Sequence, residues 1–378
     1  MDLDLNREQK ALKNSAREFL KKECPRSLLH EMKDDLRGYP QALWDKMADL
    51  GWPGLAIPEK YGGFGGRFMD VCVLLEAMGE ACCPGPYYST IVLGALPIMF
   101  AGTEKQKQTL LPEIAEGKLI CAFAMMEPEA WYGPEGISFS AVEDNDVYRL
   151  NGTKLFVENA HIADYILCVA RTSTGENTKS GLTIFLVNAK SSGIRSSVLN
   201  TLAYDKQCEV VFNNVTVPKD NILGDVDGAW PILQKVQDHA AVAKCADMLG
   251  AMQAVFDMTV AYAKERKQFG QPIGSFQAIQ HHCANMVIDV DGARFITYFA
   301  AWELSEGQDA SMDASMAKAW TGKASGRVTL LAHQIHGAIA FCEEMDVHLF
   351  YRRAKCGDIT FGDSDWHLKE VARGLGLP

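Results

Sequence analysis

The sequence predicts an α+β protein, mostly helical, in which one β domain separates two helical regions. Apolar residues recur at helical spacing through residues 1–118 and again through residues 226–378. Residues 119–225 instead alternate apolar and polar side chains between closely spaced turns, which is typical of an antiparallel barrel or sandwich. We therefore predict three domains with these boundaries: an N-terminal helical domain, a middle β domain and a C-terminal helical bundle.

Composition excludes several classes of function. The net charge is -11 over 378 residues, so a nucleic-acid-binding protein, which needs a dominant basic surface, is not expected. No apolar run approaches the length of a membrane span, and the N-terminus is acidic and polar, so we expect a cytoplasmic protein without membrane contact. Eleven cysteines without C-x-x-C spacing indicate free thiols. His161 and the pair His281 and His282 lack companion ligands, so no metal site is expected.

Within the first region, an apolar stripe through Leu12, Ala16 and Leu20 predicts a helix that ends before Pro25. A second helix is expected through Leu43 and Met47. Residues 51–66 contain too many glycines for regular structure and predict a loop. Helices are expected again over residues 71–83 and 91–100.

In the middle region, residues 147–150, 165–170 and 182–187 read as strands. Asn151 and Gly152 lie between two apolar runs, and this dipeptide predicts a tight hairpin turn. The third region opens with a long helix whose last turn is basic, at Lys264, Arg266 and Lys267. Gly270 and Pro272 are expected to stop it, and Ser275 is the expected N-cap of the following helix.

Several motifs occur in an order that identifies a family. Residues 262–277 read Tyr-Ala-x-x-Arg-x-x-Phe-Gly-x-Pro-Ile-x-x-Phe-Gln, and similar signatures lie at residues 58–63, 102–112, 125–128, 150–164 and 334–338. Together they resemble the acyl-CoA dehydrogenase family of flavoproteins over nearly the whole chain, and the chain looks like a divergent bacterial-type member. The resemblance implies that family's helical, β, helical fold.

The resemblance also implies an FAD cofactor. Arg266 would bind its diphosphate, because a guanidinium fork suits phosphate oxygens. Phe269 and Gln277 would line the same pocket, while Gln334 and Gly337 would approach from a partner chain. Ala338 replaces the second glycine of that last motif, so the backbone approach is less free there.

The residues implied around the flavin ring depart from the family pattern. Met126 stands where a threonine is usual, and Phe156 replaces a tryptophan. Glu158 replaces the threonine or serine near flavin N5, where a carboxylate should lower the reduction potential unless it is protonated or turned away. Tyr132 belongs to a loop rebuilt with aromatic residues. Tyr132 and Asp238 are the residues expected to contact acyl-CoA.

The family uses a carboxylate as its catalytic base, in one of two places. At the first, near the C-terminus, the resemblance aligns Asp363 with the usual glutamate, and Asp365 stays open because the register is uncertain by a residue. The second place corresponds to Ala240, which has no carboxylate, so the base is not expected there. Asp363 is about 1.5 Å shorter in reach than glutamate. The substrate therefore sits closer, the base serves a different carbon, or Asp363 is a solvated turn residue.

The resemblance thus implies FAD-dependent α,β-dehydrogenation of an acyl-CoA thioester, with electrons passed to an electron-transfer flavoprotein. A branched, cyclic or aromatic acyl group would suit the aromatic wall. A homotetramer or heterotetramer is expected. Two alternatives stay open: a non-catalytic or half-active subunit of a heteromeric dehydrogenase, and a flavin-assisted elimination on a CoA thioester without net oxidation.

Overall fold

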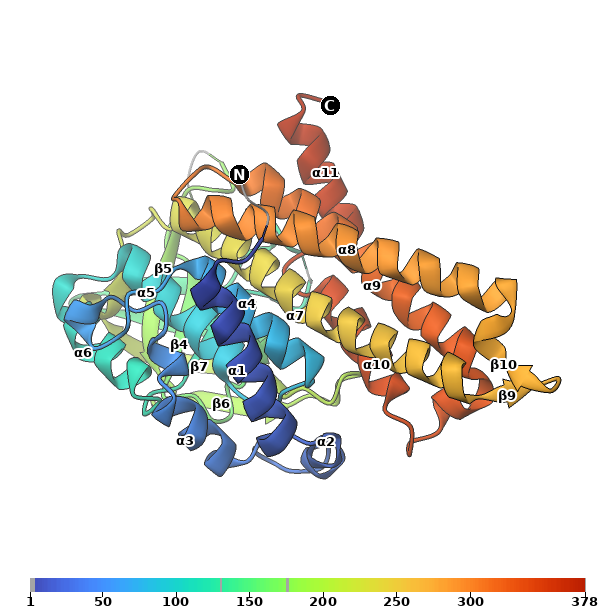
Figure 1. Ribbon diagram of the computed structural model, residues 1–378. Coiled ribbons are helices and arrows are strands. Elements are labelled where there is room, and N and C mark those ends of the chain that lie inside the picture. The colour runs from blue at the N-terminus through green and yellow to red at the C-terminus, as the bar shows by residue number, and fades with distance from the viewer. Residues whose placement is uncertain (1–3, 130, 175–176, 378) are drawn as a thin grey trace. The chain divides into compact units, whose positions relative to one another are not determined.

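The computed structural model describes residues 4–129, 131–174 and 177–377, and Ala130 of the predicted aromatic loop lies outside this set. The predicted mostly helical fold with a central β region is confirmed (Figure 1). Among the residues described, no helix is long and apolar enough to cross a membrane.

The chain forms two compact units that are not continuous in sequence. The helical unit comprises Met1–Glu31, Arg67–Cys83 and Asp238–Pro378, and the sheet unit comprises Met32–Gly66 and Pro84–Gln237. This division reflects spatial compactness and does not test sequence boundaries. The domain boundaries predicted near residues 118 and 225 therefore stay a prediction.

The helical unit is built from long helices and one short hairpin. They are α1 (Arg7–Glu23), most of α2 (Arg26–Met32), α4 (Phe68–Glu80), most of α7 (Trp230–Glu265), β9 (Lys267–Gln268), β10 (Gln271–Pro272), α8 (Gln277–Ser305), α9 (Ser311–His336), α10 (Val347–Ile359) and α11 (Ser364–Gly374). In Figure 1 the β9–β10 hairpin projects from the end of α7.

Buried polar contacts fix the packing of α1. Asn6 begins this helix with a reciprocal capping box to Gln9. On its inner face, the Lys13 ammonium donates to Glu76 of α4 at 2.7 Å and to the Tyr298 hydroxyl of α8 at 3.1 Å. Burial lowers the pKa of Lys13. These bonds compensate the cost of closing a charge off from water.

Helices α4 and α7 cross at two glycines. A β-carbon on Gly79 would lie 2.0 Å from the Asp247 carbonyl oxygen, and one on Gly250 would lie 1.9 Å from the Glu76 carbonyl oxygen. Both are far inside van der Waals contact, so the helix backbones touch directly. Only glycine fits at either position.

The connection from α7 to α8 differs in detail from the sequence prediction. Helix α7 ends at Glu265, close to where the basic turn and Gly270 placed its end. The predicted N-cap is wrong: Phe276 occupies that position and makes no side-chain cap bond. The Ser275 hydroxyl instead donates to the Pro272 carbonyl oxygen at 2.6 Å, because a short 3₁₀ turn (Ile273–Ser275) precedes the helix.

The sheet unit combines a β-sheet with helical segments. Its helices are α3 (Gln41–Asp49), a π-helix (Tyr88–Ala95), α5 (Leu96–Ala101) and α6 (Glu104–Ala115). Its strands are β1 (Cys121–Ala124), β2 (Ser140–Asp144), β3 (Val147–Glu158), β4 (Tyr165–Arg171), β5 (Leu182–Asn188), β6 (Ile194–Val198), β7 (Gln207–Pro218) and β8 (Ile222–Leu223).

Within the described residues these eight strands form one sheet, in the order β6-β7-β3-β2-β4-β5-β8 with β1 beside β4. Pairing is mainly antiparallel as predicted, but β1 runs parallel to β4, and β2 meets β4 in one parallel pair. Aromatic side chains fill the core, including Phe139 against Phe212 and Tyr148 against Phe185.

The predicted hairpin at Asn151 and Gly152 is wrong. Both residues lie inside β3, where the register with β7 shifts between Leu150 and Gly152. Gly152 has φ 138 and supplies the bulge, while the Asn151 side chain accepts from the backbone N–H of Asn214 at 2.7 Å. An asparagine–glycine pair suits a bulge as well as a turn, since both need unusual backbone angles.

Replacing Gly250 with alanine should destabilise the protein by about 1–3 kcal/mol, because the new methyl group meets backbone atoms that cannot move independently. The control is Gly326→Ala on α9, where a β-carbon would meet only the Lys355 ammonium at 3.6 Å. That variant should be as stable as the parent or more so. Chemical denaturation of both variants tests this, and equal stabilities would contradict the direct backbone contact.

Candidate functional site

An ion pair closed off from solvent anchors the predicted flavin wall in the sheet unit. The Lys154 ammonium of β3 donates to Glu127 at 2.8 Å and to the Met125 carbonyl oxygen at 3.0 Å, and the two charged side chains are 0% and 3% exposed. Glu127 also accepts from the backbone N–H groups of Ser138 and Phe139. Burial would raise the pKa of Glu127, but Lys154 and Ser138 outweigh it and hold the pKa low.

The anchored strand presents two of the predicted flavin contacts. The backbone N–H of Leu155 donates to the Met126 carbonyl oxygen at 2.9 Å, beside the ion pair. A second bulge follows, where the register shifts between Lys154 and Val157. Phe156 lies in it with φ 54 and is 50% exposed, so its ring stands away from the sheet. Glu158 ends the strand opposite Gln207.

The aromatic loop is tied to the first turns of α7. The Gln237 side chain donates to the Tyr132 carbonyl oxygen at 3.0 Å. Trp131 is 53% exposed and its indole N–H donates to Glu135. The Tyr132 backbone is thus fixed within the sheet unit.

Predicted FAD residues of the helical unit gather at the α7–α8 turn. Arg266 is exposed, and no hydrogen bond or ion pair reaches its guanidinium from the described residues. Phe269 has φ 55 and is 93% exposed, with its ring 6.1 Å from that of Phe276. Gln277 is exposed at the first position of α8. An unpaired cation beside an exposed aromatic ring fits the diphosphate and adenosine portions of FAD.

The C-terminal end of α9 lies beside this turn. His336, in the last turn of α9, stacks on Tyr262 of α7 with ring centroids 4.4 Å apart. Gln334 is exposed, and Gly337 follows the helix with φ 69 and ψ -148, a conformation open to glycine alone. Both predicted residues therefore lie near the turn, on the same chain.

Asp238 lies near the boundary of the helical unit. The Ser311 hydroxyl donates to its carboxylate at 2.6 Å. Burial raises the pKa of Asp238 to about 6, although the Ser311 bond opposes the rise. A half-buried carboxyl group with a pKa raised in this way is typical of functional sites.

The predicted base begins the last helix. Asp363 is the N-cap of α11, and its Oδ1 accepts from the backbone N–H of Trp366 at 2.7 Å. This is the usual role of an aspartate at a helix N-terminus. The alternative, Asp365, lies in the first turn of α11, is exposed and pairs with Lys323 at 3.0 Å.

Two buried side chains hold the turn that precedes Asp363. The Lys318 ammonium donates to the carbonyl oxygens of Asp358 and Gly362 at 2.5 and 2.6 Å. His367 Nε2 donates to the Phe361 carbonyl oxygen at 2.9 Å. Burial lowers the pKa of Lys318 to about 8, and burial together with the Lys318 charge lowers the pKa of His367 to about 3. The turn is thus fixed from two sides by residues of α9 and α11.

The structure gathers the predicted residues within each unit. Arg266, Phe269 and Gln277 share one turn, and Met126 and Phe156 flank one ion pair. Sequence reasoning gave Lys154, Lys318 and His367 no role. The available signal in the sequence was a charged residue at a position where an uncharged one is expected. Lys154 lies in a strand in which apolar and polar residues otherwise alternate, and Lys318 lies among the small residues of α9. Across the described residues, no group of three His, Cys, Asp or Glu side chains is placed to hold a metal ion.

A helical bundle, a β domain and an exposed cation beside an exposed aromatic ring agree with the predicted class, the FAD-dependent oxidoreductases. Family models for the acyl-CoA dehydrogenase N-terminal, middle and C-terminal domains match residues 6–118, 122–215 and 228–376. The chain therefore belongs to the acyl-CoA dehydrogenase family. The predicted enzyme class, an oxidoreductase with FAD as its cofactor, is confirmed.

Curated relatives match over almost their full length. The chain is 33% identical to the probable acyl-CoA dehydrogenase YngJ of Bacillus subtilis, over 99% of this chain and 100% of the relative. It is 32% identical to the caffeyl-CoA reductase-Etf complex subunit CarC of Acetobacterium woodii, over 94% and 95%. It is 31% identical to the 3-(aryl)acrylate reductase of Clostridium sporogenes, over 96% and 97%.

Solved structures agree in fold. Butyryl-CoA dehydrogenase from Megasphaera elsdenii superposes with a TM-score of 0.92 at 30% identity, covering 99% of this chain and 100% of that one. The FAD complex of PigA superposes with a TM-score of 0.93 at 25% identity, covering 100% of both chains.

The neutral His367 predicts acid sensitivity. Its folded pKa of about 3 lies below the unfolded value of 6.5, so unfolding takes up a proton between these values and stability is lost as the pH falls through that window. The loss should reach about 3 kcal/mol by pH 4.5. Denaturation at several pH values tests this. His367→Gln should flatten the slope, whereas His281→Gln, at an exposed position, should leave it unchanged.

Proposed function

We propose that this protein interconverts an acyl-CoA thioester and its α,β-unsaturated counterpart with FAD, and exchanges the electrons with an electron-transfer flavoprotein. The observation that carries the proposal is the α7–α8 turn, where an exposed arginine with no side-chain partner among the described residues lies beside a phenylalanine that is 93% exposed. An exposed guanidinium and an exposed aromatic ring both suit a bound dinucleotide.

The predicted FAD residues have separate roles in this proposal. Arg266 binds the FAD diphosphate through its guanidinium fork, while Phe269 and Gln277 flank the same group. Phe156 and the Met126 backbone face the flavin ring. Bound FAD would exchange a hydride with the β carbon of the substrate. Gln334 and Gly337 complete the dinucleotide site, from a partner chain if the protein assembles as its family resemblance implies.

The base in this proposal is Asp363. One of its oxygens, Oδ1, is engaged as the helix cap, so the other must take the proton from the α carbon. Lys318 and His367 fix the preceding turn and so limit the movement of the carboxylate. A fixed base matters, because misplacement by an ångström can cost on the order of a hundredfold in rate.

We assign an aromatic, branched or cyclic acyl group to the substrate. The loop carrying Trp131 and Tyr132 supports a bulky group, and two relatives are named for caffeyl-CoA and for 3-arylacrylates. Tyr132 and Asp238 are the proposed substrate contacts. The same relatives are reductases by name, and CarC is named as a subunit of an Etf complex. We therefore assign the direction of the reaction to the redox partner.

An assembled state is part of the proposal. On α8, the apolar residues Ile288, Phe295 and Trp302 recur every seven positions and are 64%, 50% and 39% exposed. A stripe of this kind is expected to pack against another chain. A homotetramer or a heterotetramer would cover it.

A second candidate is a half-active subunit of a heteromeric dehydrogenase. The observation in its favour is the cap bond of Asp363, which accounts for an aspartate at this position without catalysis. Flavin content separates the candidates, because a subunit that needs its partner would stay without FAD when expressed alone. A flavin-assisted elimination without net oxidation would bind FAD yet leave it oxidised on adding a thioester.

Asp363→Asn tests the base. Asparagine caps a helix as well as aspartate does, so the fold and FAD binding should persist while reduction of the flavin by an acyl-CoA slows at least about a hundredfold. Stopped-flow absorbance without oxygen measures the rate. Asp365→Asn is the matched control and should react normally. If Asp365→Asn alone is slow, the base is Asp365, two residues further along the chain; if neither is slow, a carboxylate base at these two positions is excluded.

Arg266→Gln tests the cofactor site. Loss of a charge-assisted contact should weaken FAD binding by about 10- to 100-fold, measured by fluorescence titration of the protein stripped of flavin. Lys264→Gln removes the same charge from an exposed position at the same end of α7 and should bind FAD normally. Equal weakening in both variants would point to general electrostatics and against a specific contact.

A further inference from the structure

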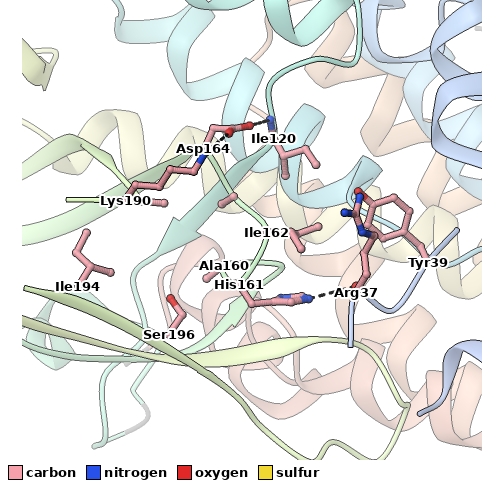
Figure 2. Close-up of a pocket in the computed structure, with 12 residues that line it drawn as sticks. Arg37, Tyr39, Ile120, Ala160, His161, Ile162, Asp164, Lys190, Ile194 and Ser196 are labelled. Atoms are coloured by element: carbon pink, nitrogen blue, oxygen red, sulfur yellow. Dashed lines mark hydrogen bonds and ion pairs between the residues drawn. The ribbon is translucent and has the colours of Figure 1, made fainter. Parts of the chain in front are cut away.

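The sheet unit contains a pocket that none of the predicted FAD or acyl-CoA residues lines. Its volume is about 470 Å³, and it lies between the residues just before α3, the β3–β4 connection and β6. Figure 2 shows Arg37 and Tyr39 on one side, Ile194 and Ser196 on the opposite side, and His161 and Ile162 between them. The volume falls in the range of about 300–1,000 Å³ typical of small-molecule sites.

Part of the lining is apolar. The side chains of Ile120, Ile162, Ala163 and Ile194 contribute hydrocarbon surface, and the Tyr39 ring adds an aromatic face. These side chains offer a small apolar surface that suits a ligand with a compact apolar body beside its polar group. The apolar residues come from separate elements of one unit, so the shape of the pocket is set by the fold of that unit.

One guanidinium is held at the edge of this apolar surface. Arg37 Nη1 donates to the Gln41 side chain, and the guanidinium carbon lies 5.8 Å from the centre of the Tyr39 ring. The Arg37 carbonyl oxygen also accepts from His161 Nε2 at 3.2 Å, which fixes the loop that carries it. No ion pair to Arg37 is found among the described residues. Its positive charge is therefore not compensated in a chain whose net charge is -11.

The other charges of the lining largely cancel. Asp164 accepts from the backbone N–H of Ile120 at 3.0 Å and lies 3.8 Å from the Lys190 ammonium. Burial lowers the pKa of His161, so this ring is neutral at pH 7. The Ser196 hydroxyl has no hydrogen bond to the described residues and is available to a ligand. The pocket thus offers one net positive charge and one free hydroxyl.

We propose that this pocket binds a small aromatic monocarboxylate, with the carboxylate on the Arg37 fork and the ring against Tyr39, Ile162 and Ile194. One uncompensated cation matches a single negative charge, and a guanidinium suits the planar carboxylate. The several phosphate charges of a CoA thioester would not be matched here. The inference is independent of the proposed reaction, because it uses no residue assigned to FAD or to proton transfer.

Calorimetric titration of the FAD-loaded protein with 3-phenylpropionate tests the proposal. We expect one site per chain, with binding weakened about tenfold or more in Arg37→Gln. Arg195→Gln is the matched control: Arg195 lies between Ile194 and Ser196 on β6 but points to the opposite face, so binding should be unchanged. Ser196→Phe fills the pocket without changing the charge and should abolish binding, with thermal denaturation used to confirm that each variant folds.

Results of three kinds would overturn the proposal. The first is no binding of 3-phenylpropionate, or equal losses in Arg37→Gln and Arg195→Gln. The second is displacement by inorganic phosphate at similar concentration, which would show a general anion site. The third is displacement by 3-phenylpropionyl-CoA, which would make the pocket part of the reaction site.

Discussion

The sheet unit depends on a lysine and a glutamate that are both withdrawn from water. Lys154 and Glu127 join the middle of β3 to the segment after β1, and Glu127 also gathers the backbone of Ser138 and Phe139. A charge buried without its partner would cost several kcal/mol, so the two segments must come together as a pair. Because Met126 and Phe156 flank this bond, the geometry of the proposed flavin wall depends on it.

Unusual backbone angles mark the surfaces assigned to the cofactor. Phe156, Phe269 and Gly337 all have positive φ, in a strand bulge, a helix turn and a helix end. A phenylalanine in this conformation carries a strain of about 1–3 kcal/mol. Each ring is at least half exposed, so packing within the chain does not repay that strain. Contact between these rings and a bound cofactor would offset the strain.

The order of motifs was sufficient to predict the fold, the family and the cofactor, because together the motifs cover nearly the whole chain in the order of the family they resemble. Local details were less accessible. Asn151 and Gly152 satisfy a bulge and a hairpin equally well, and the choice depends on pairing with β7, which is distant in sequence. Ser275 is one residue from the true cap, since a 3₁₀ turn intervenes. Likewise, an aspartate suits both a base and a helix cap, and its second role becomes visible only when α11 is seen to begin there.

The crossing of α4 and α7 has a genetic consequence. Most crowded positions in a core can be relieved by a smaller neighbouring side chain, so harmful substitutions often have suppressors elsewhere in the gene. At Gly79 and Gly250 the atoms in the way are carbonyl oxygens, 2.0 and 1.9 Å from the added carbon. Every amino acid carries that oxygen, so no second substitution at Asp247 or Glu76 removes it. A search for revertants of either variant should return mainly the glycine codon.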